Sequence, residues 1–133
     1  MKVRAVRSGM WLLTALSLVV TGCFDDPSGP GTISLTVRGP IPLGAALVEI
    51  VGEGLRGVEQ PAVGWAELVP VAPIGSTPVH RLILIQDAPG ELRIRLQVVD
   101  VAAPYPVATV IEATDQADAP VPSPASIEVL IRP

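Results

Sequence analysis

Few side chains in this chain of 133 residues could support nucleophilic or acid–base catalysis. His80 is the only histidine, and the nearest hydroxyls, Ser76 and Thr77, lie in a proline-rich stretch without a nucleophile-elbow motif. No two acidic residues are spaced to suggest the carboxylate pair of a glycosidase. Zinc is not favoured, because one histidine and one cysteine cannot supply the usual ligands. We therefore expect a protein that is not an enzyme and has no cofactor, with a hydrolase as the less favoured alternative.

Three aspartates are the best candidates for a calcium site, since calcium takes carboxylate and carbonyl oxygens. Asp115 and Asp118 stand close together in a loop-forming stretch, and Asp100 lies in the preceding loop. The sequence around them does not form a complete calcium-loop signature. We therefore expect these side chains to be solvated in turns, and calcium binding is the alternative.

The aromatic side chains Trp65 and Tyr105 are the candidates for contacting a ligand. If both are exposed side by side, they could stack on a sugar or anchor a protein partner. We favour instead a Trp65 that fills the core and a Tyr105 that packs over a loop. Both interpretations place them in a domain whose core must be built mainly from aliphatic residues, because aromatics make up only 3% of the chain.

Glu91, Arg93 and Arg95 alternate with apolar residues along one stretch and predict a charged outer face of a strand. We expect Arg93 and Arg95 to lie opposite acidic residues of a neighbouring strand. The other arginines are scattered along the sequence, which shows no basic patch.

The first 22 residues have the pattern of a secretion signal. Lys2, Arg4 and Arg7 are their only charged residues, and an uncharged apolar run from residue 10 to residue 20 follows. This run is too short for a membrane span, which needs about 20 apolar residues, but it suits the central part of a signal peptide.

The end of this segment, Val20-Thr21-Gly22-Cys23, resembles the lipobox of bacterial lipoproteins. The family pattern is an aliphatic residue, a small residue, glycine or alanine, and then cysteine. The resemblance implies a diacylglycerol on the Cys23 thiol, cleavage before Cys23, and acylation of the new amine by a chain such as palmitate. Several acyl chains anchor a protein stably where one binds only marginally. Phe24, in place of an aspartate after the cysteine, favours delivery to the outer membrane.

These features divide the chain into a signal peptide at 1–22, a flexible tether at 23–31 rich in proline and glycine, and a domain at 32–133. After removal of the signal, six arginines face 13 acidic residues, which gives a formal charge of −7. So acidic a domain does not favour nucleic acid as a partner. A disulfide within the chain is excluded by the single cysteine.

The domain shows alternating apolar patterns separated by turn residues, which predict an all-β fold. Seven strands are expected, at residues 32–38, 45–51, 64–69, 79–86, 91–101, 107–114 and 125–132. Residues 55–63 are expected to form a loop with at most a weak short element, and residues 70–78 a long connection. The strands at 79–86 and 91–101 are expected to form a hairpin through a type II turn at 87–90. The apolar run 82–85 predicts burial on both faces, as in a central strand.

An antiparallel sandwich of about seven strands, immunoglobulin-like or cohesin-like, fits these elements, and a small barrel is the alternative. The stretch from Gly90 onward, with Glu112-Ala113-Thr114-Asp115, resembles the C-terminal half of cohesin-like sandwiches. That resemblance implies a binding or adhesion module. We therefore expect a lipid-anchored β-sandwich in the bacterial cell envelope that binds a protein or glycan. The alternative is a structural or assembly accessory of an envelope complex.

Overall fold

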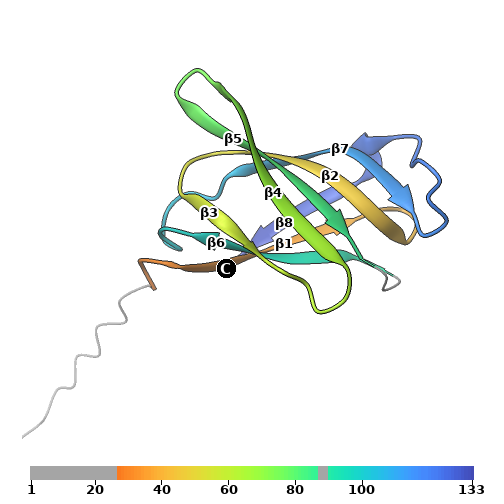
Figure 1. Cartoon of the computed structure of the whole chain (residues 1–133), viewed down its shortest axis with the longest axis horizontal. Coiled ribbons are helices and arrows are strands. Elements are labelled where there is room, and N and C mark those ends of the chain that lie inside the picture. The colour runs from red at the N-terminus through yellow and green to blue at the C-terminus, as the bar shows by residue number, and fades with distance from the viewer. Residues whose placement is uncertain (1–26, 87–89) are drawn as a thin grey trace, which may run out of the picture.

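The computed structural model describes residues 27–86 and 90–133 and confirms an all-β antiparallel sandwich (Figure 1). One four-stranded sheet, sheet A, has the strand order β3-β6-β1-β8, and the other, sheet B, has the order β4-β5-β2-β7. The strands are β1 (Gly31–Arg38), β2 (Leu43–Val51), β3 (Leu55–Glu59), β4 (Trp65–Ile74), β5 (Thr77–Ile85), β6 (Leu92–Val98), β7 (Val107–Asp115) and β8 (Glu128–Arg132). A single 3-10 turn, η1 (Pro124–Ser126), precedes β8, and no described helix is long and apolar enough to cross a membrane.

The core lies between the two sheets and follows the alternation of the sequence. In β6, Leu92, Ile94, Leu96 and Val98 are buried, while the residues between them are exposed. The inward side chains of the other strands complete an aliphatic core. Its fully buried members are Ile33, Leu35, Val37, Leu43, Val48, Ile50, Leu82, Leu84, Leu92 and Leu96. Since neighbouring positions of a strand point to opposite faces, this one-sided burial fixes the register of each strand.

The expected hairpin between residues 79–86 and 91–101 is wrong. β5 belongs to sheet B and β6 to sheet A, so the chain crosses from one sheet to the other between them. The proposed turn at 87–90 lies largely outside the described residues, which resume at Gly90. Alternation tells which face of each strand is buried, but it does not tell which sheet the strand joins.

The expected long connection at 70–78 is also wrong, because β4 continues to Ile74 and forms a hairpin with β5. Pro70 and Pro73 cannot donate a backbone hydrogen bond. They are tolerated because β4 is the edge strand of sheet B and has a neighbouring strand, β5, on one side only. Gly75 makes the tight turn with a φ of 63°. The weak element expected within 55–63 is a true strand, β3, which raises the count from about seven to eight.

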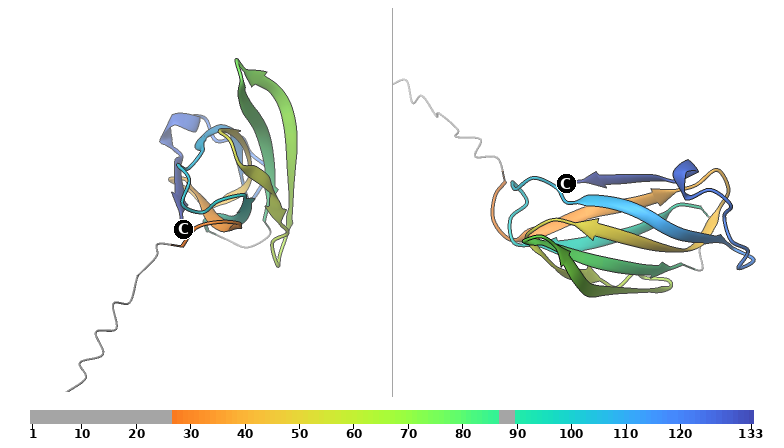
Figure 2. Two further views of the ribbon diagram at one scale, coloured as in Figure 1. Left: turned by 90° about the vertical axis from the view of Figure 1, so that its left-hand side faces the viewer. Right: turned by 90° about the horizontal axis from the view of Figure 1, so that it is seen from above.

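Residues 27–30 enter the sandwich at one end (Figures 1 and 2). The Gly29 amide donates a hydrogen bond to Asp100 Oδ1 (2.8 Å), and the Val101 amide donates to the Gly29 carbonyl (2.9 Å). Gly29, just before β1, is therefore held by Asp100 and Val101 in the loop between β6 and β7. We call the end of the sandwich that contains these three residues the tether end. The lipobox residues and Cys23 lie outside the described residues.

Candidate binding surfaces

Trp65 does not fill the core, and the favoured interpretation of this residue is wrong. It is 44% exposed on the outer face of sheet B. Its strand neighbour Ala66 points inward and is buried, as is Leu84, with which Ala66 is paired on β5. Because side chains alternate along a strand, a buried Ala66 requires an outward Trp65.

An apolar surface surrounds Trp65 on sheet B, and we call it the Trp65 face. It consists of Trp65 on β4, Ile83 and Ile85 on β5, and Ala45 and Leu47 on β2. The register places Trp65, Ile85 and Ala45 in one row across three strands. A shallow hollow of about 190 Å³ is lined by four of these residues, all but Trp65, together with Ala46 and residues of β7.

Acidic side chains border the Trp65 face on both sides. The row next to Trp65 runs Glu67, Ile83, Leu47 and Glu112 across β4, β5, β2 and β7.

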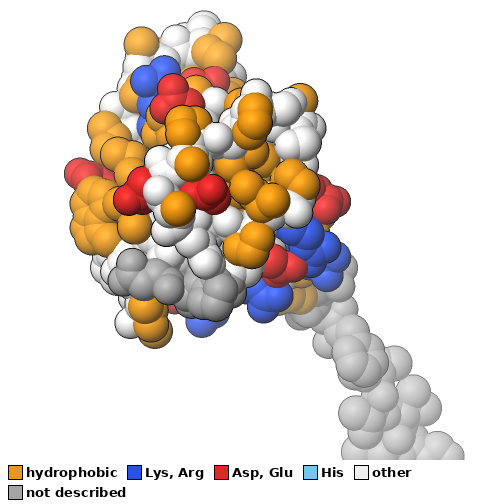
Figure 3. All heavy atoms as spheres, turned by 90° about the vertical axis from the view of Figure 1, so that its right-hand side faces the viewer, with side chains coloured by type: hydrophobic (Ala, Val, Ile, Leu, Met, Phe, Trp, Pro, Cys, Tyr) orange, Lys and Arg blue, Asp and Glu red, His pale blue; other side chains and the backbone are white. Residues whose placement is uncertain are grey.

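Ile85 is 41% exposed and Ile83 is half-buried, so the apolar run 82–85 is buried only on the side of Leu82 and Leu84. The expectation of burial on both faces of this central strand is therefore wrong for the outer face. Figure 3 views the end of the molecule opposite the tether end, where apolar side chains are spread over the surface.

Tyr105 is also exposed, at 41%, but it lies in the loop between β6 and β7 at the tether end. After it, Val107 pairs with Val51 at the last position of β2, whereas Trp65 lies in the row of Ala45 near the start of β2. Six residue steps along a strand span about 20 Å. The structure therefore does not bring the two aromatic candidates together.

Of the three aspartates considered for calcium, Asp100 is separated from Asp115 and Asp118 by the length of β7. Asp100 lies at the tether end, where its Oδ1 accepts hydrogen bonds from the Gly29 and Ala102 amides, and these bonds lower its pKa below 3.8. Asp115 lies at the other end of β7, where its Oδ1 accepts from the Ala117 and Ala119 amides. Asp118, with a φ of 61°, belongs to the same turn. Within residues 27–86 and 90–133, no three metal-binding side chains are grouped.

His80 lies on β5, paired with Ile50 on one side and Pro70 on the other. Ser76 sits in the turn before β5, and Thr77 starts the strand. Neither of these two cross-strand neighbours is a nucleophile or a carboxylate.

A site that sequence reasoning missed lies on the outer face of sheet A. A groove of about 530 Å³ there is lined by four of the six arginines that follow Cys23. We call it the arginine groove and define it by Ser34, Thr36, Arg38, Arg93, Arg95 and Arg132. These arginines are scattered in sequence, and only the pairing of β1 with both β6 and β8 gathers them.

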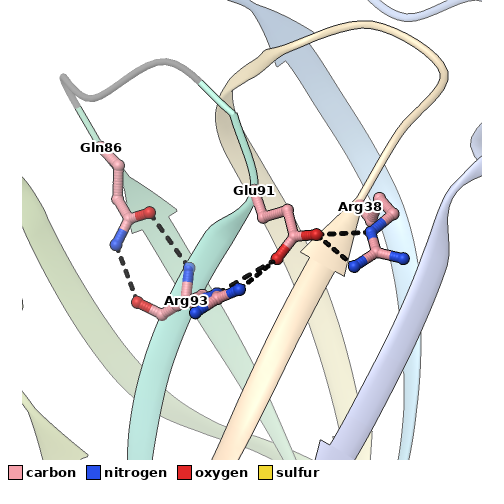
Figure 4. A network of polar contacts seen from close by, with 4 residues as sticks. All are labelled: Arg38, Gln86, Glu91 and Arg93. Atoms are coloured by element: carbon pink, nitrogen blue, oxygen red, sulfur yellow. Dashed lines mark hydrogen bonds and ion pairs between the residues drawn. The ribbon is translucent and has the colours of Figure 1, made fainter.

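Glu91 joins two of these arginines (Figure 4). Its Oε2 accepts hydrogen bonds from Arg93 Nη2 (2.8 Å) and Nε (3.1 Å), and its Oε1 accepts from Arg38 Nε (2.6 Å) and also pairs with Arg38 Nη2. The hydrogen bonds from Arg93 and then those from Arg38 lower the pKa of Glu91 below its ordinary value of 4.5. The ionised form of Glu91 is therefore favoured, and the two guanidinium groups share its carboxylate.

The predicted cross-strand charge pairing is confirmed for Arg95, which lies opposite Glu59 of β3, with Nε and Oε2 3.6 Å apart. It is wrong for Arg93, whose ion-pair partner is Glu91 just before β6, and whose neighbour on β1 is Thr36. Instead, the Gln86 side chain joins the backbone of Arg93, donating from Nε2 to its carbonyl (2.7 Å) and accepting from its amide (3.1 Å). Gln86 thereby ties the end of sheet B to sheet A.

Comparison of the chain with protein-family models, with curated proteins and with solved structures found no match.

Proposed function

We propose that this protein is a lipid-anchored, non-catalytic binding module of the bacterial cell envelope that binds a protein partner through the Trp65 face. The observation that carries this proposal is the position of that face. It combines an exposed indole with aliphatic side chains of three adjacent strands, and it lies toward the end of the sandwich opposite the tether end.

The anchor is proposed at Cys23, with delivery to the outer membrane, on the lipobox residues and on Phe24. The chain from Cys23 to Gly29 can span at most about 20 Å. A lipid on Cys23 would therefore keep the tether end near the bilayer, and the Trp65 face lies toward the opposite end of the sandwich. A surface at that end is accessible to other envelope components.

The chemistry of the Trp65 face favours a protein over a glycan. A sugar site needs several hydrogen-bonding groups beside its aromatic platform, whereas Trp65 has the apolar Ile85 and Ala45 in its row and Glu67 as its polar neighbour in the next row. An apolar centre with charged residues at its border, here Glu67 and Glu112, is the usual composition of a protein–protein interface. Tryptophan is also among the residues that contribute most to such interfaces. A binding role agrees with the resemblance to cohesin-like and immunoglobulin-like sandwiches.

The anchor is tested by metabolic labelling with a palmitate analogue. The wild-type protein should carry the label, and Cys23→Ser should lose it and accumulate as the longer precursor. Adding Ser28→Cys to the Cys23→Ser protein is the matched control, since a cysteine outside the lipobox should not restore labelling. A Cys23→Ser protein that is still labelled and still processed would overturn the anchor.

The binding role is tested by recovering the protein from chemically crosslinked envelopes. A partner that belongs to the Trp65 face should be recovered with the wild-type protein and lost with Trp65→Ala, and it should be retained with Arg56→Gln, an exposed substitution on β3 of the other sheet. A recovered partner that is equally abundant with Trp65→Ala would contradict the assignment of this face. If the lost partner is a multi-protein assembly, the accessory role is favoured over a simple binding module.

A further inference from the structure

The arginine groove has the volume of a ligand site, and it lies on the opposite side of the sandwich from the Trp65 face. Its volume of about 530 Å³ falls within the range of typical ligand sites. The small side chains of Ser34 and Thr36 on β1 form its floor. Longer side chains rise on both sides, from β6 and from β8.

Two arginines flank one hydroxyl group on this floor. Ser34 is paired with Arg95 of β6 on one side and with Arg132 of β8 on the other. Neighbouring strands are about 4.8 Å apart, so the Cα atoms of the two arginines are separated by about 10 Å across Ser34. Arginine side chains are long enough to converge over that distance on a group placed above the serine.

Arg95 and Arg132 are less tightly paired than Arg38 and Arg93, which share the carboxylate of Glu91. Within the part of the chain that the structure describes, Arg132 forms no ion pair. Arg95 donates from Nη2 to Thr32 Oγ1 (2.7 Å), and its contact with Glu59 is 3.6 Å long between exposed groups. Such a pair contributes little to stability, so a ligand can replace it at small cost. The groove as a whole sets four arginines against two glutamates in an otherwise acidic domain.

We propose that the arginine groove binds the oxyanion group of a ligand, a carboxylate or a phosphate, between Arg95 and Arg132 with the Ser34 hydroxyl donating from below. Guanidinium groups present paired donors that match both oxyanions. The residues that line the groove include no aromatic side chain, so a nucleobase would have no ring to stack on. The specificity therefore comes from the charged group of the ligand.

The proposal is tested with the purified full chain by nuclear magnetic resonance, observing the Nε–Hε signals of the arginines. Inorganic phosphate and citrate, a tricarboxylate, are titrated separately while sodium chloride keeps the ionic strength constant. We expect the Arg95 and Arg132 signals to shift saturably with at least one probe. Saturation by phosphate alone identifies a phosphate ligand, saturation by citrate alone identifies a carboxylate ligand, and saturation by both supports the shared chemistry.

Substitutions locate the binding. Arg132→Gln should raise the Kd at least about tenfold, since it removes hydrogen bonds between charged groups. Arg132→Lys, which keeps the charge and loses the planar fork, should give an intermediate Kd, and Arg56→Gln should leave the Kd unchanged. Ser34→Ala, which retains both arginines, should weaken binding about threefold and provides a second variant if Arg132→Gln is poorly folded.

Two results would overturn the proposal: shifts that do not saturate with either probe, or a saturable shift with the same Kd in Arg132→Gln and Ser34→Ala as in the wild type. The site does not rest on the proposed protein-binding role, and Trp65→Ala should leave the Kd for either probe unchanged. The failure of one proposal can therefore be told apart from the failure of the other.

Discussion

Trp65 and Ile85 are paired across β4 and β5, and both side chains are exposed on the outer face of sheet B. The next pair, Ala66 and Leu84, is buried between the sheets. Two consecutive apolar pairs thus have opposite environments, one in the core and one on the surface. The core needs the inner pair, and nothing in the packing of the two sheets requires the outer pair to be apolar. The proposed binding role rests on this outer pair.

This contrast predicts different effects on stability. Leu84→Ala should lower the free energy of unfolding by about 2–5 kcal/mol, since it leaves a cavity in the core. Trp65→Ala should lower it by less than half of that amount, because the indole is half-exposed. Urea denaturation of the two variants, followed by circular dichroism, gives both values. A larger loss for Trp65→Ala than for Leu84→Ala would show that the indole belongs to the core.

Gly64 positions the start of β4, and its replacement should disturb the Trp65 face. Its φ is 104°, and a Cβ atom there would overlap the Ile85 carbonyl oxygen and lie 2.8 Å from Gln86 Cα. Gly75 has a φ of 63° but has open space around the Cβ position. We expect Gly75→Ala to cost about 1 kcal/mol from backbone strain alone and Gly64→Ala to cost about 3 kcal/mol or more. Thermal unfolding of the two variants provides the comparison, and equal losses would contradict the close approach of Gly64 to β5.

The lowered pKa of Glu91 predicts the direction of a pH dependence. The ionised carboxylate is favoured in the folded state by Arg93 and Arg38, so its contribution is fully present above pH 4.5 and is lost as the pH falls through the lowered pKa. Glu91→Gln should therefore be less stable than the wild type at pH 7, and the difference should shrink below pH 4.5. Urea midpoints at pH 7 and pH 3 measure this.

Glu67→Gln serves as the control for Glu91→Gln. It also removes one negative charge, but from an exposed residue that forms no ion pair within the described chain. A Glu91→Gln protein whose stability difference from the wild type is the same at both pH values would argue against the pairing with Arg38 and Arg93.

The all-β class and the faces of most strands could be predicted because they are local properties. The alternation of apolar and polar residues from Leu92 to Val98 directly predicts which side chains enter the core. The partner of each strand is not local. Nothing in the sequence near Asp87 indicates that the chain leaves sheet B and enters sheet A. Likewise, Pro70 and Pro73 would end a central strand but not an edge strand, and the sequence does not show which strands lie at an edge.

The candidate sites depend even more on distant pairing. Arg95 and Arg132 belong to one site only because β1 lies between β6 and β8. The exposure of Trp65 could not be predicted, because the weak alternation of residues 64–69 is compatible with either face of the strand pointing inward. The apolar run 82–85 is equally compatible with a strand that is buried on both faces and with a strand whose outer face is apolar but exposed.

The most direct test of the account is photo-crosslinking in living cells with a photoreactive amino acid placed at Ile85 of the anchored full-length protein. We predict a discrete crosslinked product of higher mass that contains a protein partner. This product should be abolished by Trp65→Ala. It should also be absent when the photoreactive residue replaces the exposed Ala125 of η1 instead of Ile85. If no product forms at Ile85, or if the same product forms equally at Ala125, the Trp65 face is not the surface by which this protein binds a partner.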